Sequence, residues 1–395
     1  MSNIQSALAA ALPHTVSLRQ RLHAIPELSY EEHKTADLIR SELRRLNIPL
    51  TAGVPGAPTA TIGLVGDPGK PCIAFRADID ALPVQEETGQ PYASTHPGRM
   101  HACGHDGHTA TLLGTAAILS QLASSLPVCV KLIWQPAEET GGGALRLVEA
   151  GVLGGRIGPK VQAIFGLHGW PALPLGTVST KPGAFLASTD SFAATFIGRG
   201  CHGAYPHLGI DPIPAACEAV LSLQQCISRE FDPTEPGLVT VGTVQAGTAV
   251  NIIPDTASIS GTARSFTESA RSKLREAIER RCAGVAAAQG CQLRFEWTEG
   301  YPPTLNEPAM TDYFQRTAQA TLGPEAFVAA SRPSMSGEDF AYYLEKVPGC
   351  FFFLGVCPPG QETCFSLHSN RYNFNDAALP VGMRMFVALV MNFHP

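Results

Sequence analysis

The spacing of apolar residues near the start of the chain predicts an amphipathic helix. Within residues 31–47 the apolar positions recur every three or four residues, at Ala36, Ile39, Leu43 and Leu46. This is the period at which one face of a helix meets a core. Ser29 and Glu32 precede it with the S-x-x-E spacing of a capping box, which predicts where the helix begins.

Short apolar runs of the kind found in buried strands follow. They are PCIAF at 71–75, VCVKLIW at 128–134 and VQAIFGL at 161–167. Segments with helical character, 107–123 and 144–151, separate these runs. Strands that alternate with helices predict an α/β fold with a mainly parallel sheet.

The pattern changes near residue 186. Strand-like alternation and helical periodicity now follow in the order β-α-β-β-α-β, over residues 188–200, 211–230, 237–247, 255–266, 267–290 and 291–299. This order is the split βαβ arrangement of a small two-layer domain. The chain then returns to helices around the apolar run CFFFLGV. We therefore predict a larger domain made of residues 1–185 and 299–395, with a second domain, residues 186–298, inserted into it.

The composition narrows the classes of partner and location. Of 395 residues, 45% are hydrophobic and 16% charged, and the net charge is −6. Without a basic stripe, nucleic acid and anionic membrane are not expected partners. No apolar run reaches the ~18 residues of a membrane span, and the N-terminus lacks the basic and apolar regions of a signal peptide. Eleven cysteines without a CxxC pair predict reduced thiols and a cytoplasmic location.

Polar side chains follow each of the predicted buried strands. Asp78 and Asp80 follow the first, Glu138 and Glu139 the second, and His168 the third. Because ligands bind beyond the carboxyl ends of parallel strands, we expect these side chains to meet at one rim of the sheet.

The segment HACGHDGH, residues 101–108, joins this rim just before a predicted helix. Gly104 allows a turn that brings Cys103 and His105 towards one point. Thiolate, imidazole and carboxylate form the ligand set of zinc and similar metals. From the cluster alone, a nucleophilic cysteine or a purely structural turn stays open. His101 and His108 are expected beside the ligands or on the helix surface.

The adjacent residues Glu138 and Glu139 are expected to have two different roles. Adjacent residues at a strand end point to different sides, so one carboxylate can bind a metal while the other faces a water molecule. Metal-assisted hydrolysis needs this arrangement, because a carboxylate must take the proton of the attacking water. A solvated loop pair is the alternative, but Pro136 and the glycines 141–143 favour a fixed loop.

Eight motifs occur in the order found in a known family. They are RADIDALP, MHACGHDGHT, QPAEE, FGLHGWP, GRGCHGAYPHLGIDP, VNIIPD, SGEDFAYY and SLHSNRYNFND. From about residue 18 to its end, the chain resembles the hippurate hydrolases and N-acyl-amino-acid amidohydrolases. These are aminoacylase-like di-metal metallopeptidases that include the auxin-conjugate hydrolases. The resemblance implies a di-metal aminopeptidase-like catalytic domain with an inserted lid or dimerisation domain.

The resemblance also assigns roles at the rim. It implies two divalent ions, Zn, Mn, Co or Ni, held by Cys103 as the bridge together with His105, Glu139, His168 and His368. Glu138 would be the general base and later the acid for the leaving amine. Asp78 would orient a ligand imidazole.

Further roles fall on the inserted domain. His202 resembles the family histidine that reaches the active site, usually from the other subunit, and stabilises the oxyanion. Asn251 and Arg264 resemble groups that hold the free carboxylate of the substrate. The chain departs from the family pattern at Cys201, where glycine is usual, which puts the backbone around His202 in question.

The function implied is hydrolysis of N-acyl amino acids to a carboxylic acid and a free amino acid, in a homodimer or homotetramer. One alternative is a dipeptidase or carboxypeptidase of the same fold. Another is a hydrolase with Cys103 as nucleophile and His105 or His101 as base. A non-catalytic metal-binding or assembly protein is a third.

Overall fold

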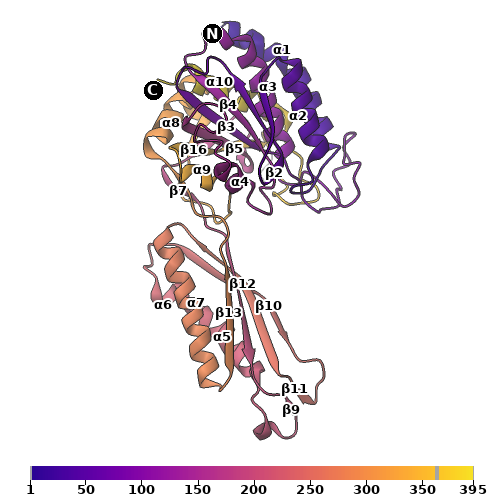
Figure 1. Cartoon of the computed structure of the whole chain (residues 1–395), viewed down its shortest axis with the longest axis vertical. Helices are drawn as coiled ribbons and strands as arrows, with labels where there is room; N and C mark the ends of the chain where they lie inside the picture. Colours follow the sequence, from indigo (N-terminus) through magenta and orange to yellow (C-terminus); the bar gives the residue numbers. More distant parts are fainter. Residues whose placement is uncertain (1, 361–363, 395) are drawn as a thin grey trace. The chain divides into compact units, whose positions relative to one another are not determined.

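The chain folds into two compact units. The structure, a computed structural model, describes residues 2–360 and 364–394 (Figure 1). The first unit comprises the chain up to Gly183, Leu305–Arg332, and the chain from Asp339 onward. The second comprises Ala184–Thr304 and Pro333–Glu338. The borders lie within a few residues of the predicted ones. Residues 333–338 were expected in the larger, catalytic domain. They belong to the second unit because they run beside its first residues, where Ala187 N donates to Ser334 O at 3.1 Å.

A mixed sheet forms the centre of the first unit. Its strand order is β1-β2-β4-β3-β5-β16-β6-β15. The neighbours β4, β3, β5 and β16 are parallel, which confirms the predicted mainly parallel sheet. Every residue of β3 and β4 is buried, the charged Arg76, Asp78 and Lys131 included, as in strands covered on both faces. The strands are β1 (Leu50–Val54), β2 (Ala57–Val65), β3 (Cys72–Asp78), β4 (Cys129–Gln135), β5 (Val161–Pro174), β6 (Val178–Thr180), β15 (Phe327–Ala329) and β16 (Gly349–Cys357).

Helices pack against this sheet. The predicted buried helix is α3, which contacts β3 and β5 and is covered by α1 and α10. None of the helices in the described part of the chain is long and apolar enough to cross a membrane. The α-helices are α1 (Ser2–His23), α2 (His33–Arg45), α3 (His105–Gln121), α4 (Gly143–Glu149), α8 (Pro308–Leu322), α9 (Ala341–Leu344) and α10 (Leu379–Met391). Short 3-10 turns are η1 (Ala123–Ser125), η3 (Pro324–Ala326) and η4 (Asp376–Ala378).

The predicted capping box does not form. Helix α2 begins at His33, and the side chain of its N-cap residue, Glu32, makes no capping bond. The Glu27 carboxylate caps the first turn instead, since it accepts from Lys34 N at 3.1 Å and from Thr35 N at 2.9 Å. Ser29 Oγ instead donates to Asp80 Oδ2 at 2.7 Å, and Glu32 Oε1 accepts from Ala137 N at 2.9 Å. Ser29 and Glu32, which were expected to cap the helix, therefore form hydrogen bonds with buried groups at the rim of the sheet instead.

The second unit is a four-stranded antiparallel sheet with helices on it. The strand order is β10-β12-β8-β13, and the elements follow one another as predicted. Helices α5 and α7 pack against each other and on β12. The elements are β8 (Asp190–Ile197), β9 (Cys201–His202), η2 (Pro206–Leu208), α5 (Pro212–Leu223), α6 (Gln225–Glu230), β10 (Gly237–Ala246), β11 (Ile252–Ile253), β12 (Thr256–Ser265), α7 (Glu268–Ala288) and β13 (Gln292–Thr298). Strands β7 (Gly183–Leu186) and β14 (Thr304–Asn306) occur where the chain passes from one unit to the other.

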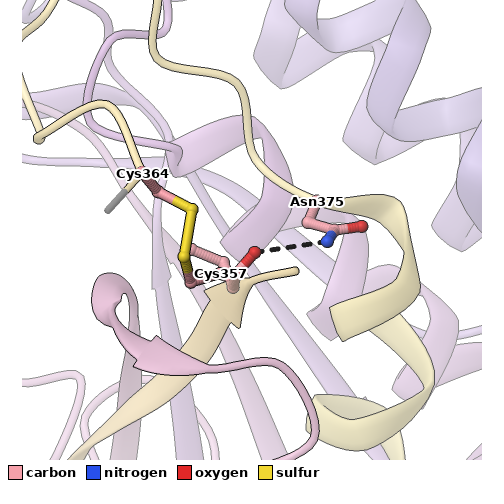
Figure 2. The surroundings of a disulfide bond; sticks show 4 residues. Cys357, Cys364 and Asn375 are labelled. Carbon is pink, nitrogen blue, oxygen red and sulfur yellow. Dashed lines mark hydrogen bonds between the residues drawn. A yellow bond between two sulfur atoms is a disulfide. The ribbon is translucent and has the colours of Figure 1, made fainter. Parts of the chain in front are cut away.

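Two of the cysteines, which were all expected to be reduced, form a disulfide. Cys357, at the end of β16, is bonded to Cys364 (Figure 2). Beside it, Asn375 Nδ2 donates to Val356 O at 3.2 Å. The other nine cysteines are free. The prediction of reduced thiols is therefore wrong for this pair, whose members lie seven residues apart in the sequence.

Candidate active site

The carboxyl ends of the parallel strands carry the predicted site residues. Asp78 ends β3 and is paired in register with Gln135, the last residue of β4. His168 lies on β5, opposite Phe353 of β16. Because these strands run in the same direction, their ends deliver side chains to one rim.

A tight turn brings Cys103 and His105 to this rim. Gly104 between them has φ 89°, in the left-handed region, and precedes the first residue of α3. A Cβ at this glycine would lie 2.9 Å from the Tyr372 hydroxyl. Conformation and space therefore both require glycine here. Cys103 and His105 are both buried.

All five predicted ligands and the predicted base gather around this turn. Cys103 Sγ lies 3.3 Å from His168 Nε2. Sets of donor atoms within 4.8 Å of one another include Cys103–His105–His168, Cys103–Glu139–His368 and His105–Glu138–Glu139. Cys103 and His105 each belong to two of these sets, so the donors form one continuous cluster.

Two backbone positions at the cluster are held in unusual conformations. Ala137, just before the glutamates, has φ 57°, and His368 has φ 66°. Left-handed conformations of non-glycine residues cost free energy and persist where the surroundings impose them. His368 is fixed because its backbone N donates to Ala102 O at 2.9 Å. This bond ties the distant C-terminal segment to the turn that carries Cys103.

The residues present fit a pair of divalent cations. His105 Nε2 and Glu139 Oε1 are buried, and neither has a hydrogen-bond partner within the described residues. They lie 3.9 Å apart. Two unpartnered ligand atoms that face the same space are what a bound cation would satisfy. The thiol, imidazole and carboxylate donors match zinc and its neighbours.

The charged groups around the cluster also favour a bound cation. Burial alone lowers the pKa of His105, but the carboxylates of Asp78 and Asp80 outweigh this and raise the pKa to about 10. Burial raises the pKa of Cys103 well above its usual value, and the carboxylates of Glu139 and Glu138 raise it further. The site therefore concentrates negative charge that a cation would balance.

The family follows from the sequence match over this same region. Residues 74–392 match the profile of peptidase family M20/M25/M40. The chain belongs to this family. The resemblance read from the eight motifs is thereby confirmed, as is the prediction of a hydrolytic enzyme.

Relatives within the family cover nearly the whole chain. An N-acetylcysteine deacetylase of Bacillus subtilis is 40% identical over 95% of this chain and 96% of its own length. The IAA-amino acid hydrolase ILR1-like 4 of Arabidopsis thaliana is 39% identical over 96% and 85%. The crystal structure of YXEP of Bacillus subtilis, described as a dinuclear metal binding peptidase, superposes with a TM-score of 0.82. It is 37% identical and covers 97% of this chain and 98% of that one.

In this M20 family member, the carboxylates of Asp78 and Asp80 both lie beside the imidazoles of the turn. Asp80 Oδ1 lies 3.2 Å from His105 Nδ1. Asp78, which the resemblance assigns to orienting a ligand imidazole, accepts from His108 Nδ1 at 2.6 Å and from Arg76 at 2.8 Å, and its Oδ2 lies 3.7 Å from His105 Nε2. The two aspartates are separated by one residue, so the motif alone could not distinguish them.

The two remaining histidines of the turn are not on the helix surface, since both are buried. His108 Nε2 accepts from Gly169 N at 2.8 Å, and its Nδ1 faces Asp78, so both ring nitrogens are in use. His108 therefore packs beside the ligands and has no lone pair left for a metal. For His101, burial lowers the pKa to about 4, which keeps the ring neutral.

His202 and Asn251 lie together in the second unit. Strands β9 and β11 pair antiparallel, with His202 opposite Ile252, and Gly203 N donates to Asn251 O at 2.8 Å. His202 Nδ1 accepts from Ala204 N at 3.0 Å, which leaves the proton on Nε2. Cys201 Sγ approaches Tyr205 O at 3.5 Å. Successive strand residues face opposite sides, so this thiol leaves the His202 ring undisturbed.

Arg264 is far from that pair. Asn251 precedes β12, whereas Arg264 is the last residue but one of this strand. At ~3.3 Å per residue, the length of β12 separates them by about 25 Å. Asn251 and Arg264 of one chain therefore cannot both bind one substrate carboxylate. The two residues could share this role only if they came from different subunits. Burial lowers the pKa of Arg264, and the guanidinium is half-buried.

Proposed function

We propose that this protein is a metal-dependent amidohydrolase that cleaves N-acyl amino acids into a carboxylic acid and a free amino acid. The observation that carries the proposal is the cluster of five ligand side chains with one further carboxylate beside it. The ligands are Cys103, His105, Glu139, His168 and His368, and the further carboxylate is Glu138. The names of the two sequence relatives support an N-acyl amino acid as substrate.

The proposed roles follow from the chemistry of each residue. The ligand set would hold two divalent ions, for which its thiolate and imidazoles favour zinc, with manganese, cobalt or nickel as alternatives. Bound there, such ions lower the pKa of a water molecule and polarise the acyl carbonyl. Glu138 accepts the proton of the attacking water and returns it to the departing amine. Asp80 and Asp78 orient the imidazoles of the turn.

The second unit would supply the oxyanion donor. His202 carries its proton on Nε2, on an exposed side chain, and can donate it to the developing oxyanion. Because Asn251 and Arg264 are about 25 Å apart, we propose that His202 and Asn251 act on the site of a second subunit in a homodimer. Mixing inactive His202→Ala and Glu138→Gln proteins should then restore activity through mixed dimers.

A matched pair of variants tests the assignment. Glu138→Gln should keep its metal and lose turnover, whereas Glu139→Gln should lose metal. Metal content is measured by elemental analysis, and turnover on acetyl-, benzoyl- and indole-acyl amino acids. If Glu138→Gln hydrolyses these substrates at the normal rate, the proposed base is wrong.

Two other functions give different results in the same assays. The description of YXEP as a peptidase favours a dipeptidase or carboxypeptidase activity, which would appear as faster cleavage of dipeptides than of N-acyl amino acids. A Cys103 nucleophile would keep its activity after chelation and lose it on alkylation. A cytoplasmic location remains our prediction, and cell fractionation tests it, since the disulfide removes one of its arguments.

A further inference from the structure

The motif SGEDFAYY contains a buried carboxylate to which the proposed function gives no role. Asp339 follows the crossing segment 333–338 and is fully buried. A carboxylate in such a place is costly unless donors surround it. The groups that donate hydrogen bonds to Asp339 therefore show which segments this carboxylate holds in place.

Asp339 binds both ends of the loop that carries the glutamates. Gln135, the last residue of β4, donates from Nε2 to Asp339 Oδ1 at 3.0 Å and to Oδ2 at 2.8 Å. Ala144 N, in the first turn of α4, donates to Asp339 Oδ2 at 2.9 Å. The residues between these two donors include Glu138 and Glu139. One carboxylate therefore fixes the points where this loop leaves the sheet and enters the helix.

Arg76 connects this clamp to the strand beside it. Its Nη2 donates to Asp339 Oδ1 at 2.7 Å, and its Nη1 to Asp78 Oδ2 at 2.8 Å. Arg76 Nε and the Tyr343 hydroxyl both donate to Gln135 Oε1, at 2.8 and 3.1 Å. The side chains in this network are buried, so its hydrogen bonds have no water to compete with them.

The loop needs an external clamp. Ala137 has φ 57°, a left-handed conformation that costs free energy in a residue other than glycine and persists only when the surroundings impose it. An oxygen of Glu138 lies within 4.8 Å of an oxygen of Asp339. The clamp is therefore close enough for a change in it to displace the base directly.

We propose that Asp339 is a positioning residue for the general base: by binding Gln135 and Ala144 it holds the loop so that Glu138 stays where the water proton is transferred. This inference rests on the proposed function, because it presupposes that Glu138 is the base. Asp339 itself does not touch the reacting atoms.

The test compares Asp339→Asn in two backgrounds. An amide in place of the carboxylate presents an N–H group to one of its present donors, which breaks the clamp with little change in shape. We expect kcat to fall about 10- to 100-fold, the cost of a small misplacement of a catalytic group. KM and metal content should change less than about threefold. In the Glu138→Gln background, Asp339→Asn should change the residual rate little, because the carboxylate that Asp339 positions is already absent.

The outcomes separate this inference from the proposed function. If Glu138→Gln is fully active, the proposed function fails whatever Asp339→Asn does. If Glu138→Gln is inactive but Asp339→Asn keeps the normal kcat, or loses metal in proportion to activity, only this inference fails. Asp312→Asn, an exposed aspartate on α8, is the matched control and should be unchanged.

A second variant applies if Asp339→Asn does not fold. Gln135→Met keeps the volume of the side chain and removes the link between Asp339 and β4, together with the two bonds that Gln135 Oε1 accepts from Arg76 and Tyr343. We expect about a 3- to 10-fold lower kcat with unchanged metal content, because half of the clamp remains. A normal kcat in a folded, metal-loaded Gln135→Met protein would overturn the proposal.

Discussion

His105 Nδ1 lies 3.2 Å from Asp80 Oδ1, while Nε2 of the same ring is left without a hydrogen-bond partner in the described chain. The second oxygen of Asp80 accepts from Glu139 N at 3.0 Å and from Ser29 Oγ at 2.7 Å. Asp80 thus orients one proposed ligand through its ring and another through its backbone. Such carboxylate–imidazole contacts fix the tautomer that leaves the opposite nitrogen free for a metal.

Replacing Asp80 by asparagine should weaken metal binding. The amide can keep one of the present bonds but cannot accept on both sides, so the His105 ring and the Glu139 backbone lose their common support. We expect metal affinity to fall about 10- to 100-fold, the usual effect of losing such a contact. Competition with a chromophoric chelator measures it. Asp37→Asn, on the exposed face of α2, is the control. Equal affinities of the Asp80→Asn and parent proteins would contradict this role.

Much of the grouping of the candidate site residues could be predicted from the sequence, because strand direction alone brings them together. Asp78, Glu139 and His168 each follow a buried apolar run, and parallel strands bring such positions to one rim. His368 was different, since its loop carries no periodicity, and only the motif order of the resemblance pointed to it.

Other features depended on contacts that no local pattern encodes. Asp78 and Asp80 lie two residues apart at the end of β3, and only the three-dimensional packing decides which of them contacts His105 Nδ1. Ser29 matches a helix cap, yet a buried acceptor on Asp80 competes for its hydroxyl. Asp339 binds Gln135 across 204 positions of sequence, which no spacing rule could reveal.

The charge on His23 should make stability depend on pH. Burial alone lowers the pKa of His23, but the carboxylates of Asp106 and Glu86, at 2.8 and 3.2 Å, raise it to about 9. Arg19 lies 3.4 Å from the same Asp106 carboxylate, and the His101 ring is neutral nearby. Because the folded pKa exceeds the unfolded one, this stabilisation is complete below pH ~6.5 and is lost as the pH rises through about 9.

Urea unfolding of the parent and His23→Asn proteins at pH 6 and pH 10 measures this effect. The difference in unfolding free energy between them should be larger at pH 6 by on the order of 3 kcal/mol, which corresponds to the shift in pKa. Other titrating groups cancel in the comparison. A difference that stays constant between the two pH values would show that His23 is not charged in the folded protein.

Lys131 should be needed for stability but not for chemistry. Its ammonium group is buried and donates to the backbone carbonyls of Val152, Ile157 and Pro159, at 2.6, 2.6 and 2.7 Å. Lys131→Met would leave these acceptors without their donor, at a cost of about 3 kcal/mol. Denaturant unfolding checks this, with the exposed Lys346→Met as control. A loss of kcat in the folded Lys131→Met protein would indicate a role that this packing does not explain.

The disulfide should stabilise the segment that carries His368. Cys364 is bonded to the end of β16 and lies four positions before His368, whose backbone N is bonded to Ala102 O. Cys364→Ser frees this segment at one end. We expect a loss of about 2 kcal/mol in unfolding free energy, as for a short loop closed by a disulfide. Because a proposed ligand then has more freedom, metal affinity should also fall, about 3- to 10-fold.

Reduction provides an independent check on the same bond. Dithiothreitol should lower the metal affinity of the parent protein to that of Cys364→Ser and leave the variant unchanged. Cys217→Ser, which removes an exposed free thiol, controls for the loss of a cysteine as such. If reduction affects the parent and Cys364→Ser proteins equally, the effect arises at another thiol, and the link between this disulfide and His368 is wrong.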